Sequence, residues 1–264
     1  MIVTDTISDL PNEPNLITIP SYISFNSGRY IRDCDIDKPS FITSVWNNVP
    51  NTCAPRPRDF QSLYASLAPI HDHVYSIHSS INTSSIYLKA MEASKPYDNV
   101  TVFDSGVTSA GLGAFVEEFI KTGKELEEIK ENAFFYLLLS NVSHSTNSDN
   151  INRNGIHLPL NSIISMNRGK VKTVGKFNNT VGAVELLKDI INETNTNSIH
   201  ISHSLFPAEV FDRKHKYPRS PWHTIPYELC ALNDKTTIHE MNPTLISHFG
   251  MGAVGVGFIK QTCA

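Results

Sequence analysis

The sequence predicts an α/β protein with two lobes: an N-terminal lobe in which helices flank a parallel sheet, and a second α/β lobe with a mixed sheet. Up to about residue 130, short segments rich in β-branched residues alternate with segments whose apolar residues recur every three or four positions. This alternation is typical of a parallel sheet covered by helices. From residue 125 the pattern changes to a charged helix, a hairpin and a long polar stretch. We therefore expect lobes at 1–124 and 125–264, with the tail strand returning to a site between them.

The N-terminal lobe should contain four strands, because four segments are rich in β-branched and aromatic residues. They are 1–6, 16–25, 73–80 and 99–105. Four helices are expected as well, several of them with a Ser, Asn or Pro start signal. They are 39–49, 57–68, 82–94 and 109–123. In such a sheet a ligand binds beyond the carboxyl ends of the strands, so we expect the site there.

The second lobe should begin with a charged helix at 125–133 and a strand at 134–141. The segment 142–155 is rich in Asn and Ser and is expected to be a loop. A hairpin over 163–177 should turn at 167–169, and a helix at 180–194 should follow it. The segments 198–204 and 254–260 are expected to be strands.

Composition and charge exclude several classes of function. The chain has 264 residues, is 40% hydrophobic and carries 22 Lys and Arg against 26 Asp and Glu, a net charge of −4. This content can form a proper core, and without a basic stripe nucleic acid is not expected as a partner. The longest apolar run, at 134–139, is too short to cross a bilayer, and no signal peptide is recognisable. The four cysteines form no C-x-x-C pair, so we expect reduced thiols in a cytoplasmic protein.

Two glycine motifs resemble nucleotide-binding turns, but neither meets the requirements of such a turn. Gly250, Gly252 and Gly255 satisfy G-x-G-x-x-G, but only nine residues follow, which leaves no room for the helix and second strand of a dinucleotide fold. Glycines in such a strand mark a bulge or a close approach of backbone or ligand. The segment 169–177 has five residues between its glycines instead of four, and Phe177 stands at the Ser or Thr position of a phosphate loop. No cofactor is therefore expected, and any ATP and Mg²⁺ should belong to a partner.

Separated segments of the chain resemble the motifs of one known family. "VTDTISDLP" is similar to V-T-D-S-T-x-D-L-P, "TCAPRPRDF" to T-S-Q-P-S-P-x-x-F, and "HSSINTSSIY" with the following "VFDSGVTSAGLG" to S-S-G-L-S-G-T-Y with V-x-D-S-x-x-x-S-x-G-x-G. "NPTLISHFGMGAVGVGF" is similar to G-P-V-I-G-x-H-x-G-P-G-A-x-G-x-G-F. In this order and spacing the segments resemble the DegV family of bacterial fatty-acid-binding proteins, whose best understood role is to carry the acyl chain for fatty acid kinase.

The resemblance implies that the chain binds one long-chain fatty acid in an apolar tunnel between its lobes. It also implies that the carboxylate is presented to a partner acyl kinase, and that the chain itself is a lipid carrier and no enzyme. The tail glycines would be a family feature beside the ligand. The chain departs from the motifs at Cys53, Ile81 and Ser84, and it has 174–177 where the family has V-R-G-R. These departures concern kinase docking more than acyl binding.

A fatty acid needs an apolar tunnel for its chain and a polar anchor for its carboxylate. Ser80 ends the expected strand before a helix from residue 82, so its hydroxyl and the backbone N–H of Ile81 should lie where a helix N-terminus favours an anion. Ser79 takes this role if the register differs by one residue. By the resemblance, Thr52 donates a second hydrogen bond and His248 a third, which is charge-assisted if the imidazole is protonated.

Each of these residues has a simpler interpretation. Ser80 is otherwise a helix cap, Thr52 a turn residue, and His248 a core histidine in an apolar strand. Asp5 and Asp104, both after strands, support the site through loop hydrogen bonds or cap helices.

Other chemistries remain to be compared with the carrier. His71 and His73 with His200 or His203 suggest a metal site, but no carboxylate or cysteine spacing completes it, so no metal is expected. A serine hydrolase of esters or lipids, with Ser80, His248 and Asp5 as nucleophile, base and orienter, is the enzymatic alternative, although G-x-S-x-G is absent. A structural or regulatory module would need neither tunnel nor ligand.

Overall fold

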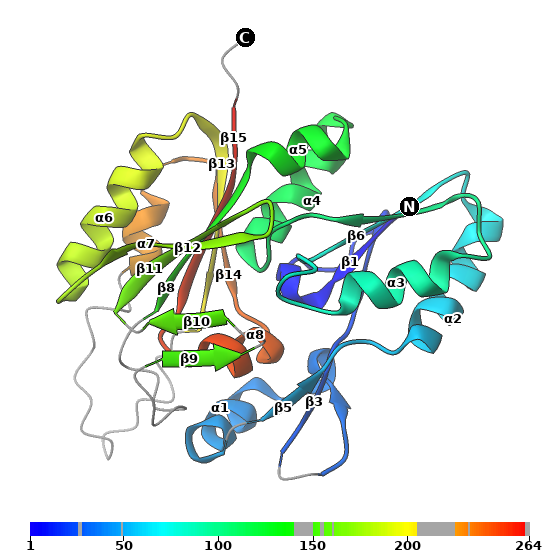
Figure 1. The fold of residues 1–264 in the computed structure, drawn as a ribbon, viewed down its shortest axis with the longest axis horizontal. Helices are drawn as coiled ribbons and strands as arrows, with labels where there is room; N and C mark the ends of the chain where they lie inside the picture. The colour runs from blue at the N-terminus through cyan, green and yellow to red at the C-terminus, as the bar shows by residue number, and fades with distance from the viewer. Residues whose placement is uncertain are drawn as a thin grey trace.

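The structure is a computed structural model that describes residues 1–25, 28–48, 50–139, 150–153, 156–159, 161–204, 225–231 and 233–261. Its two main sheets lie side by side, each with helices packed on it (Figure 1). The first is the four-stranded sheet β2-β1-β6-β7, in which every pair is parallel. The second is the mixed six-stranded sheet β12-β11-β8-β15-β13-β14. This architecture confirms the α/β fold class.

The elements have the following bounds in the described part of the chain. The strands are β1 Ile2–Asp5, β2 Leu16–Ile19, β3 Tyr22–Ser24, β4 Ile31–Arg32, β5 Asn51–Cys53, β6 Val74–His78, β7 Val100–Asp104, β8 Ala133–Leu139, β9 Asn150–Arg153, β10 Ile156–Pro159, β11 Ser162–Asn167, β12 Lys170–Lys176, β13 Thr196–His203, β14 Thr236–Glu240 and β15 Val254–Lys260. The helices are α1 Lys38–Asn47, α2 Pro57–Leu67, α3 Ile86–Ser94, α4 Ala110–Thr122, α5 Leu126–Asn132, α6 Thr180–Asn192, α7 Ile225–Cys230 and α8 Pro243–Phe249.

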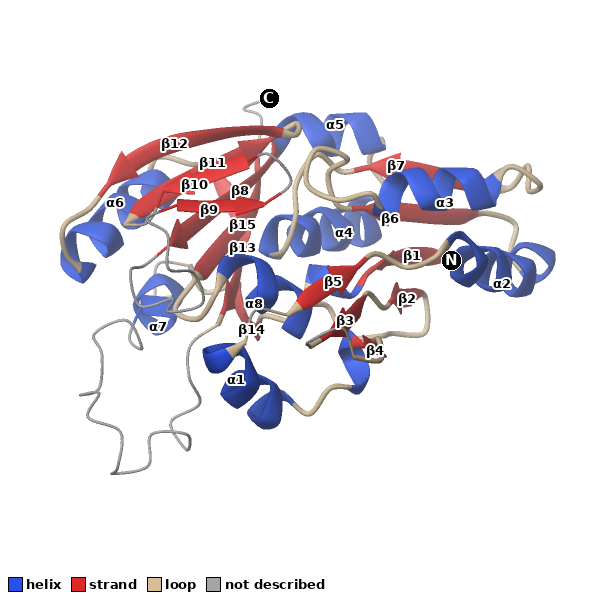
Figure 2. Cartoon of the chain, turned by 60° about the horizontal axis from the view of Figure 1, so that its bottom comes forward, coloured by secondary structure: helices blue, strands red, loops and turns tan. Residues whose placement is uncertain are grey.

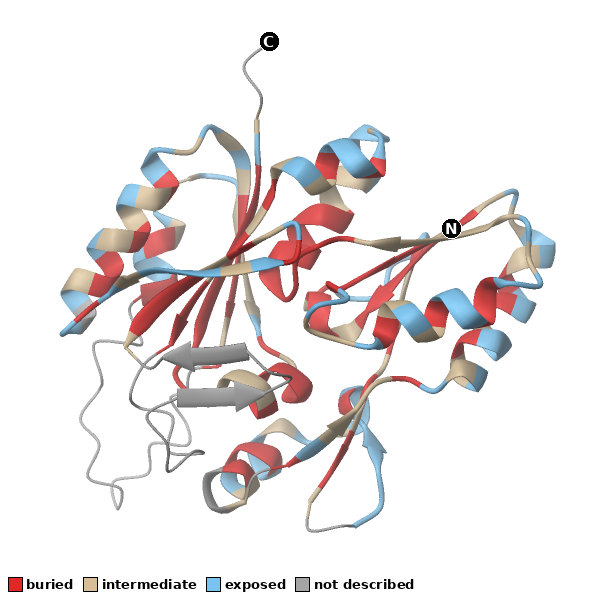
Figure 3. Cartoon of the chain, viewed as in Figure 1, coloured by how far each residue is buried: buried red, intermediate tan, exposed pale blue. Residues whose placement is uncertain are grey.

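Both faces of the six-stranded sheet are covered. On one face, α6 and α7 bury apolar side chains such as Leu187 and Leu229 against Ile199 and Val256 of the strands. On the other face, α4 packs against β8, β13 and β15. The helices show buried faces toward the sheets and exposed faces outward, as amphipathic surface helices do (Figure 3).

Helix α4 joins the two sheets, although it follows the last strand of the first sheet. Its apolar residues Leu112 and Phe115 belong to a core cluster that also contains Ile77 of β6 and Phe135 of β8. One continuous core therefore extends from the first sheet to the second. The lobe boundary at 124 stays a prediction.

The glycines of the tail strand allow α4 to approach the sheet. A Cβ on Gly257 would overlap the backbone of Ala110 and Gly111 in α4, and a Cβ on Gly255 would lie 2.8 Å from Phe135 and from Ser202. Of the two roles that the sequence leaves open for these glycines, the structure shows close approach of backbone.

Several expected elements differ from the structure. The strand expected at 16–25 is divided into β2 and β3, because Pro20 lies between them and β3 joins the small sheet β4-β3-β5. The helix expected from residue 82 begins only at Ile86, since 81–85 forms a turn. Part of the polar segment expected to be a loop is β9, which pairs with β10, while 142–149 and 154–155 lie outside the described residues.

The C-terminal part also contains elements that the sequence pattern did not predict. Helix α8 precedes the tail strand, and α7 and β14 lie before it in the chain. Helix α8 lies next to β3 and β5 of the small sheet (Figure 2). None of the helices that the structure describes is long and apolar enough to span a bilayer.

Candidate functional site

A cavity of about 470 Å³ lies where the carboxyl ends of the parallel strands face the six-stranded sheet. Its lining includes Ile7 after β1, Ile81 after β6 and Thr108 after β7. This is the edge of the sheet at which the topology predicts a ligand. The volume is within the usual range for small-molecule sites.

The cavity lining has an apolar part and a polar part. Most apolar side chains come from β8, β11, β12 and α8, with others from the loops and from α3; they are Ile7, Ala54, Ile81, Ile86, Leu88, Phe135, Leu137, Ile164, Met166, Val171, Leu245 and Phe249. The polar side chains come mostly from the turn before α3, from β5 and from α8, and they include Thr52, Asn82, Thr83, Ser84, Ser85, Thr108, Thr244 and His248. Such a division suits an amphiphilic ligand.

Thr52 and His248 meet in this cavity, although 196 positions separate them in the sequence. The Thr52 hydroxyl lies 3.1 Å from Nε2 of the His248 ring, and the tautomer decides which atom donates. Thr52 is on β5, whereas His248 is in the last turn of α8. The expectation that His248 lies in a strand was wrong, because the side chain of Asn242 accepts a hydrogen bond from the backbone N–H of Leu245 at 3.0 Å and starts a short helix.

Two carboxylates hold the start of α8, that of the buried Asp33 and that of the partly buried Asp9. Oδ2 of Asp33 accepts hydrogen bonds from Thr6 Oγ1 at 2.8 Å, Asn242 Nδ2 at 2.9 Å and Thr244 Oγ1 at 2.8 Å. Oδ1 of Asp9 accepts from the backbone N–H of Asn242 at 2.9 Å. Burial raises the pKa of Asp33 to about 6, and burial also raises the pKa of Asp9 well above its ordinary value.

Sequence reasoning did not predict this role for Asp9 and Asp33. Asp9 lies in the first of the segments that resemble the family motifs, and Asn242 begins the last of them. A contact between those two segments was therefore a possible inference. Nothing in the sequence around Asp33 distinguishes it from an ordinary surface carboxylate.

The segment after β6 is arranged differently from the expectation. Ser79 and Ser80 are buried, and the described residues that line the cavity include Ile81 but neither serine. The backbone N–H of Ser80 donates to the carbonyl of Val107 at 2.9 Å, and that of Ile81 donates to Oδ1 of Asp104 at 3.2 Å. Because α3 begins only at Ile86, the expected helix N-terminus at Ser80 and Ile81 is absent here. Their roles as ligands stay predictions.

Asp104 and Asp5 both make loop hydrogen bonds. Asp104 accepts from the backbone N–H of Ile81 and of Gly106, and it pairs with Lys130 at 3.4 Å. Asp5 precedes a 3₁₀ turn at Thr6–Ser8 without capping it through its side chain. Of the two interpretations that the sequence leaves open, support of loops is the one observed.

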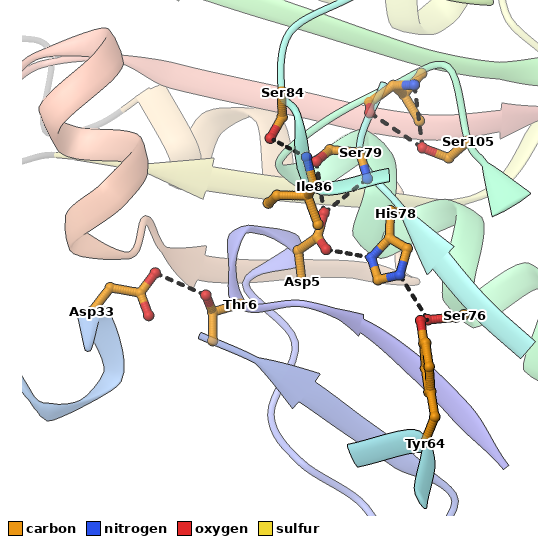
Figure 4. Close-up of polar contacts among 11 residues, drawn as sticks. Asp5, Thr6, Asp33, Tyr64, Ser76, His78, Ser79, Ser84, Ile86 and Ser105 are labelled. Carbon is orange, nitrogen blue, oxygen red and sulfur yellow. Dashed lines mark hydrogen bonds and ion pairs between the residues drawn. The ribbon is translucent and has the colours of Figure 1, made fainter. Parts of the chain in front are cut away.

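Asp5 is instead the acceptor for His78 and Ser79 (Figure 4). Its Oδ1 lies 2.5 Å from Nδ1 of His78, and its Oδ2 accepts from the backbone N–H of Ser79 at 2.8 Å and from its hydroxyl at 2.6 Å. The hydrolase alternative requires Asp5 to orient His248. Because both oxygens of Asp5 are occupied by a different histidine and serine, the contacts of Asp5 do not support that alternative.

The tip of the β11–β12 hairpin joins the six-stranded sheet to the loops after β6 and β7. The backbone N–H of Gly169 donates to the carbonyl of Gly106 at 2.7 Å, and the side chain of Asn82 donates to the carbonyl of Gly169 at 2.9 Å. A Cβ on Gly169 would lie 2.6 Å from Nδ2 of Asn82 and 3.1 Å from the hydroxyl of Ser80. Only glycine allows this close approach, and its φ of +73° is in the left-handed region.

The histidines proposed for a metal site are not gathered into one. His73 contacts the Thr101 hydroxyl at 2.8 Å, and His200 contacts Thr237 at 3.2 Å and Glu117 at 3.5 Å. Among the residues with described positions, no group of three or more His, Cys, Asp or Glu could hold a metal ion.

Comparison with known proteins assigns the chain to a family. The family described as "Uncharacterised protein, DegV family" matches residues 1–134. A DegV domain-containing protein of Staphylococcus aureus (strain COL) is 26% identical over an alignment 285 residues long, gaps included. The alignment covers 99% of this chain and 99% of that protein.

Solved structures of the same family share the fold. A DegV family protein from Thermus thermophilus, described as fatty acid binding, superposes with a TM-score of 0.75 at 21% identity, over 98% of this chain and 99% of that one. A DegV family protein from Eubacterium eligens, described as loaded with heptadecanoic acid, superposes with a TM-score of 0.72 at 13% identity, over 98% and 99% of the two chains. The expected resemblance is confirmed: this chain belongs to the DegV family.

Proposed function

We propose that this protein binds one long-chain fatty acid, with the carboxylate at Thr52 and His248 and the acyl chain along the apolar wall of the cavity. The observation that carries the proposal is the meeting of this hydroxyl and imidazole, 3.1 Å apart, in a cavity whose other wall is apolar. The relatives described as binding fatty acids support the same class of ligand.

The electrostatics of the cavity favour a single carboxylate. The described residues that line the cavity include no Asp or Glu. His248 lies at the C-terminal end of α8, where the helix dipole stabilises a protonated imidazole. A fatty-acid carboxylate would therefore meet a hydroxyl and an imidazole without an opposing carboxylate in the lining.

We further propose that the protein acts in the cytoplasm as a carrier that presents this carboxylate to an acyl kinase, which supplies ATP and Mg²⁺. The exposed side chains of Ile81, at 40%, and Leu88, at 54%, belong to the cavity lining and leave the rim accessible to a partner. The carrier itself would perform no chemistry and would release the acyl group intact.

The binding proposal is tested by mass spectrometry of denatured, freshly purified protein. We expect one fatty acid per chain. An empty protein that takes up no added fatty acid would contradict the proposal, and an empty protein that hydrolyses esters would favour the hydrolase alternative.

The carrier proposal needs a separate assay. The loaded protein is incubated with a purified bacterial fatty acid kinase and MgATP, and hydroxylamine is added to trap acyl phosphate as a hydroxamate. We expect hydroxamate only when protein, kinase and ATP are all present. Product at the same rate without this protein would show that it has no role in presenting the acyl group.

A further inference from the structure

We propose that Asp5 and His78 are positioning residues of the fatty-acid site. Through Ser79 they hold the neighbouring turn that lines the cavity, and they do not touch the ligand. The proposal rests on the proposed function. It is carried by a buried chain of hydrogen bonds that ends at the segment after β6 (Figure 4).

The chain links five side chains from three elements and one loop. The hydroxyl of Tyr64 lies 2.7 Å from that of Ser76, which lies 2.7 Å from Nε2 of His78. Nδ1 of His78 lies 2.5 Å from Oδ1 of Asp5, and Oδ2 of Asp5 accepts twice from Ser79, at 2.8 and 2.6 Å. All five residues are buried.

One arrangement of protons satisfies every step of this chain. If the neutral ring of His78 carries its proton on Nδ1, then Tyr64 donates to Ser76, Ser76 donates to Nε2 of His78, and Nδ1 donates to Asp5. Burial raises the pKa of Tyr64 above its ordinary value, so its hydroxyl stays protonated and can donate at neutral pH. The carboxylate of Asp5 then receives three hydrogen bonds, which compensate for its removal from water.

Ser79 connects this chain to the cavity. It is held through both its backbone N–H and its hydroxyl, two residues before the turn that lines the cavity from Ile81 to Ser85. Without Asp5, the two donors of Ser79 would be buried and unpaired, and the segment would have to move to satisfy them. Among the side-chain hydrogen bonds of the described residues, those that lead from Tyr64 and Ser76 to Ser79 pass through His78 and Asp5.

This difference between the two ends separates a positioning role from a purely structural one. Loss of any link lowers stability, but only loss of the Asp5 end should disturb the cavity. We therefore compare Asp5→Asn with Tyr64→Phe in protein stripped of lipid, by measuring the dissociation constant for a fluorescent polyene fatty acid and the melting temperature.

We expect Asp5→Asn to weaken fatty-acid binding about tenfold or more, and Tyr64→Phe to change it less than about twofold while still lowering the melting temperature. Two substitutions of His78 give a second test, because one keeps a hydrogen-bond donor to Asp5 and the other removes it. The amide of His78→Asn can replace the Nδ1–H donor to Asp5 and should retain affinity, whereas His78→Leu cannot and should lose it. Hydrogen exchange of the 79–85 amides should rise in Asp5→Asn and His78→Leu only.

The possible outcomes separate the two proposals. Wild-type protein that binds no fatty acid would overturn the proposed function. Wild-type binding with unchanged affinity in Asp5→Asn, or equal losses in Asp5→Asn and Tyr64→Phe, would overturn the positioning role alone. If Asp5→Asn does not fold, Ser79→Ala decides, because it removes one donor to Asp5 and should still weaken binding several-fold.

Discussion

At the scale of single residues, the proposed ligand contacts at Thr52 and His248 are the first to test. Each is expected to donate one hydrogen bond to a carboxylate, and such a bond contributes about 1–3 kcal/mol. We expect Thr52→Val and His248→Ala each to raise the dissociation constant for a fatty acid about five- to hundredfold, with little change in melting temperature. The matched control is Thr43→Val on α1, because its hydroxyl donates to the carbonyl of Pro39 and Thr43 is not among the described residues that line the cavity. Equal affinity in wild type and both site variants would refute the assignment.

A second prediction at this scale concerns pH. The hydrogen bond from His200, with help from Lys121, lowers the pKa of Glu117 to about 2, from an ordinary value of 4.5. A carboxyl whose folded pKa is depressed stabilises the protein above the unfolded pKa, and this contribution is lost as pH falls through the folded pKa. We expect Glu117→Gln to melt below wild type at pH 6 and the two to converge near pH 2. A difference in melting temperature between wild type and Glu117→Gln that does not change with pH would show that the ionisation of Glu117 beside His200 is not its cause.

At the scale of elements, the approach of α4 to β15 depends on glycine. The Cβ in Gly257→Ala would overlap backbone atoms, which cannot rotate away as a side chain can, so strand and helix must separate. We expect a loss of about 1–3 kcal/mol in the free energy of unfolding by urea. Gly182→Ala in α6 is the control, because its Cβ would meet only Asn179 Oδ1 at 3.5 Å, an ordinary contact, and it should be neutral or stabilising.

The attachment of α8 gives a prediction with the opposite pH dependence. Burial raises the pKa of Asp33 from 3.8 to about 6. A carboxyl with a raised folded pKa contributes stability below the unfolded pKa that is lost as pH rises through the folded pKa. The stability of wild type relative to Asp33→Asn should therefore fall between pH 4 and about 6.5, by about 2–3 kcal/mol at most.

The control for this experiment is Asp37→Asn. Hydrogen bonds from Ser40 lower the pKa of Asp37, so the stability of wild type relative to this variant should rise with pH. The measurement is the free energy of unfolding by urea from pH 4 to 7. If the difference between wild type and Asp33→Asn stays constant over this range, then Asp33 titrates alike in the folded and unfolded chain.

At the scale of the whole molecule, the cavity is lined by loops that follow the parallel strands and by strands of the six-stranded sheet, and the hydrogen bond from Asn82 to Gly169 joins these two sides. If the lobes must separate for the acyl chain to leave, then loss of this bond lowers the barrier to release. We expect Asn82→Ala to speed dissociation of a fluorescent fatty acid about fivefold in stopped-flow measurements. Asn99→Ala, which breaks hydrogen bonds to Ala68 and His71 within the first lobe, should cost stability without changing that rate. Equal rates in wild type and Asn82→Ala would exclude this route of release.

The sequence by itself was sufficient for the fold class, for most strands and helices, for the family and for the edge of the sheet at which the cavity lies. These features depend on local periodicity and on motif order, which one chain displays directly. The helix at 109–123 and the hairpin turn at 167–169 are confirmed, because their apolar spacing and turn residues determine the backbone locally. The roles of Thr52, Ser79, Ser80, Ile81 and His248 as ligands stay predictions.

Three features follow from tertiary contacts that the sequence does not display: His248 lies on a helix, Asp33 and Asp9 hold this helix, and Asp5 pairs with His78. The helix has seven residues, too few for periodicity to distinguish it from a strand, and its start depends on contacts with carboxylates more than 200 positions away. A buried carboxylate needs donors, but many donors along the chain could serve, and the packing of the lobes selects among them. Long-range hydrogen bonds of this kind leave no local pattern in the sequence.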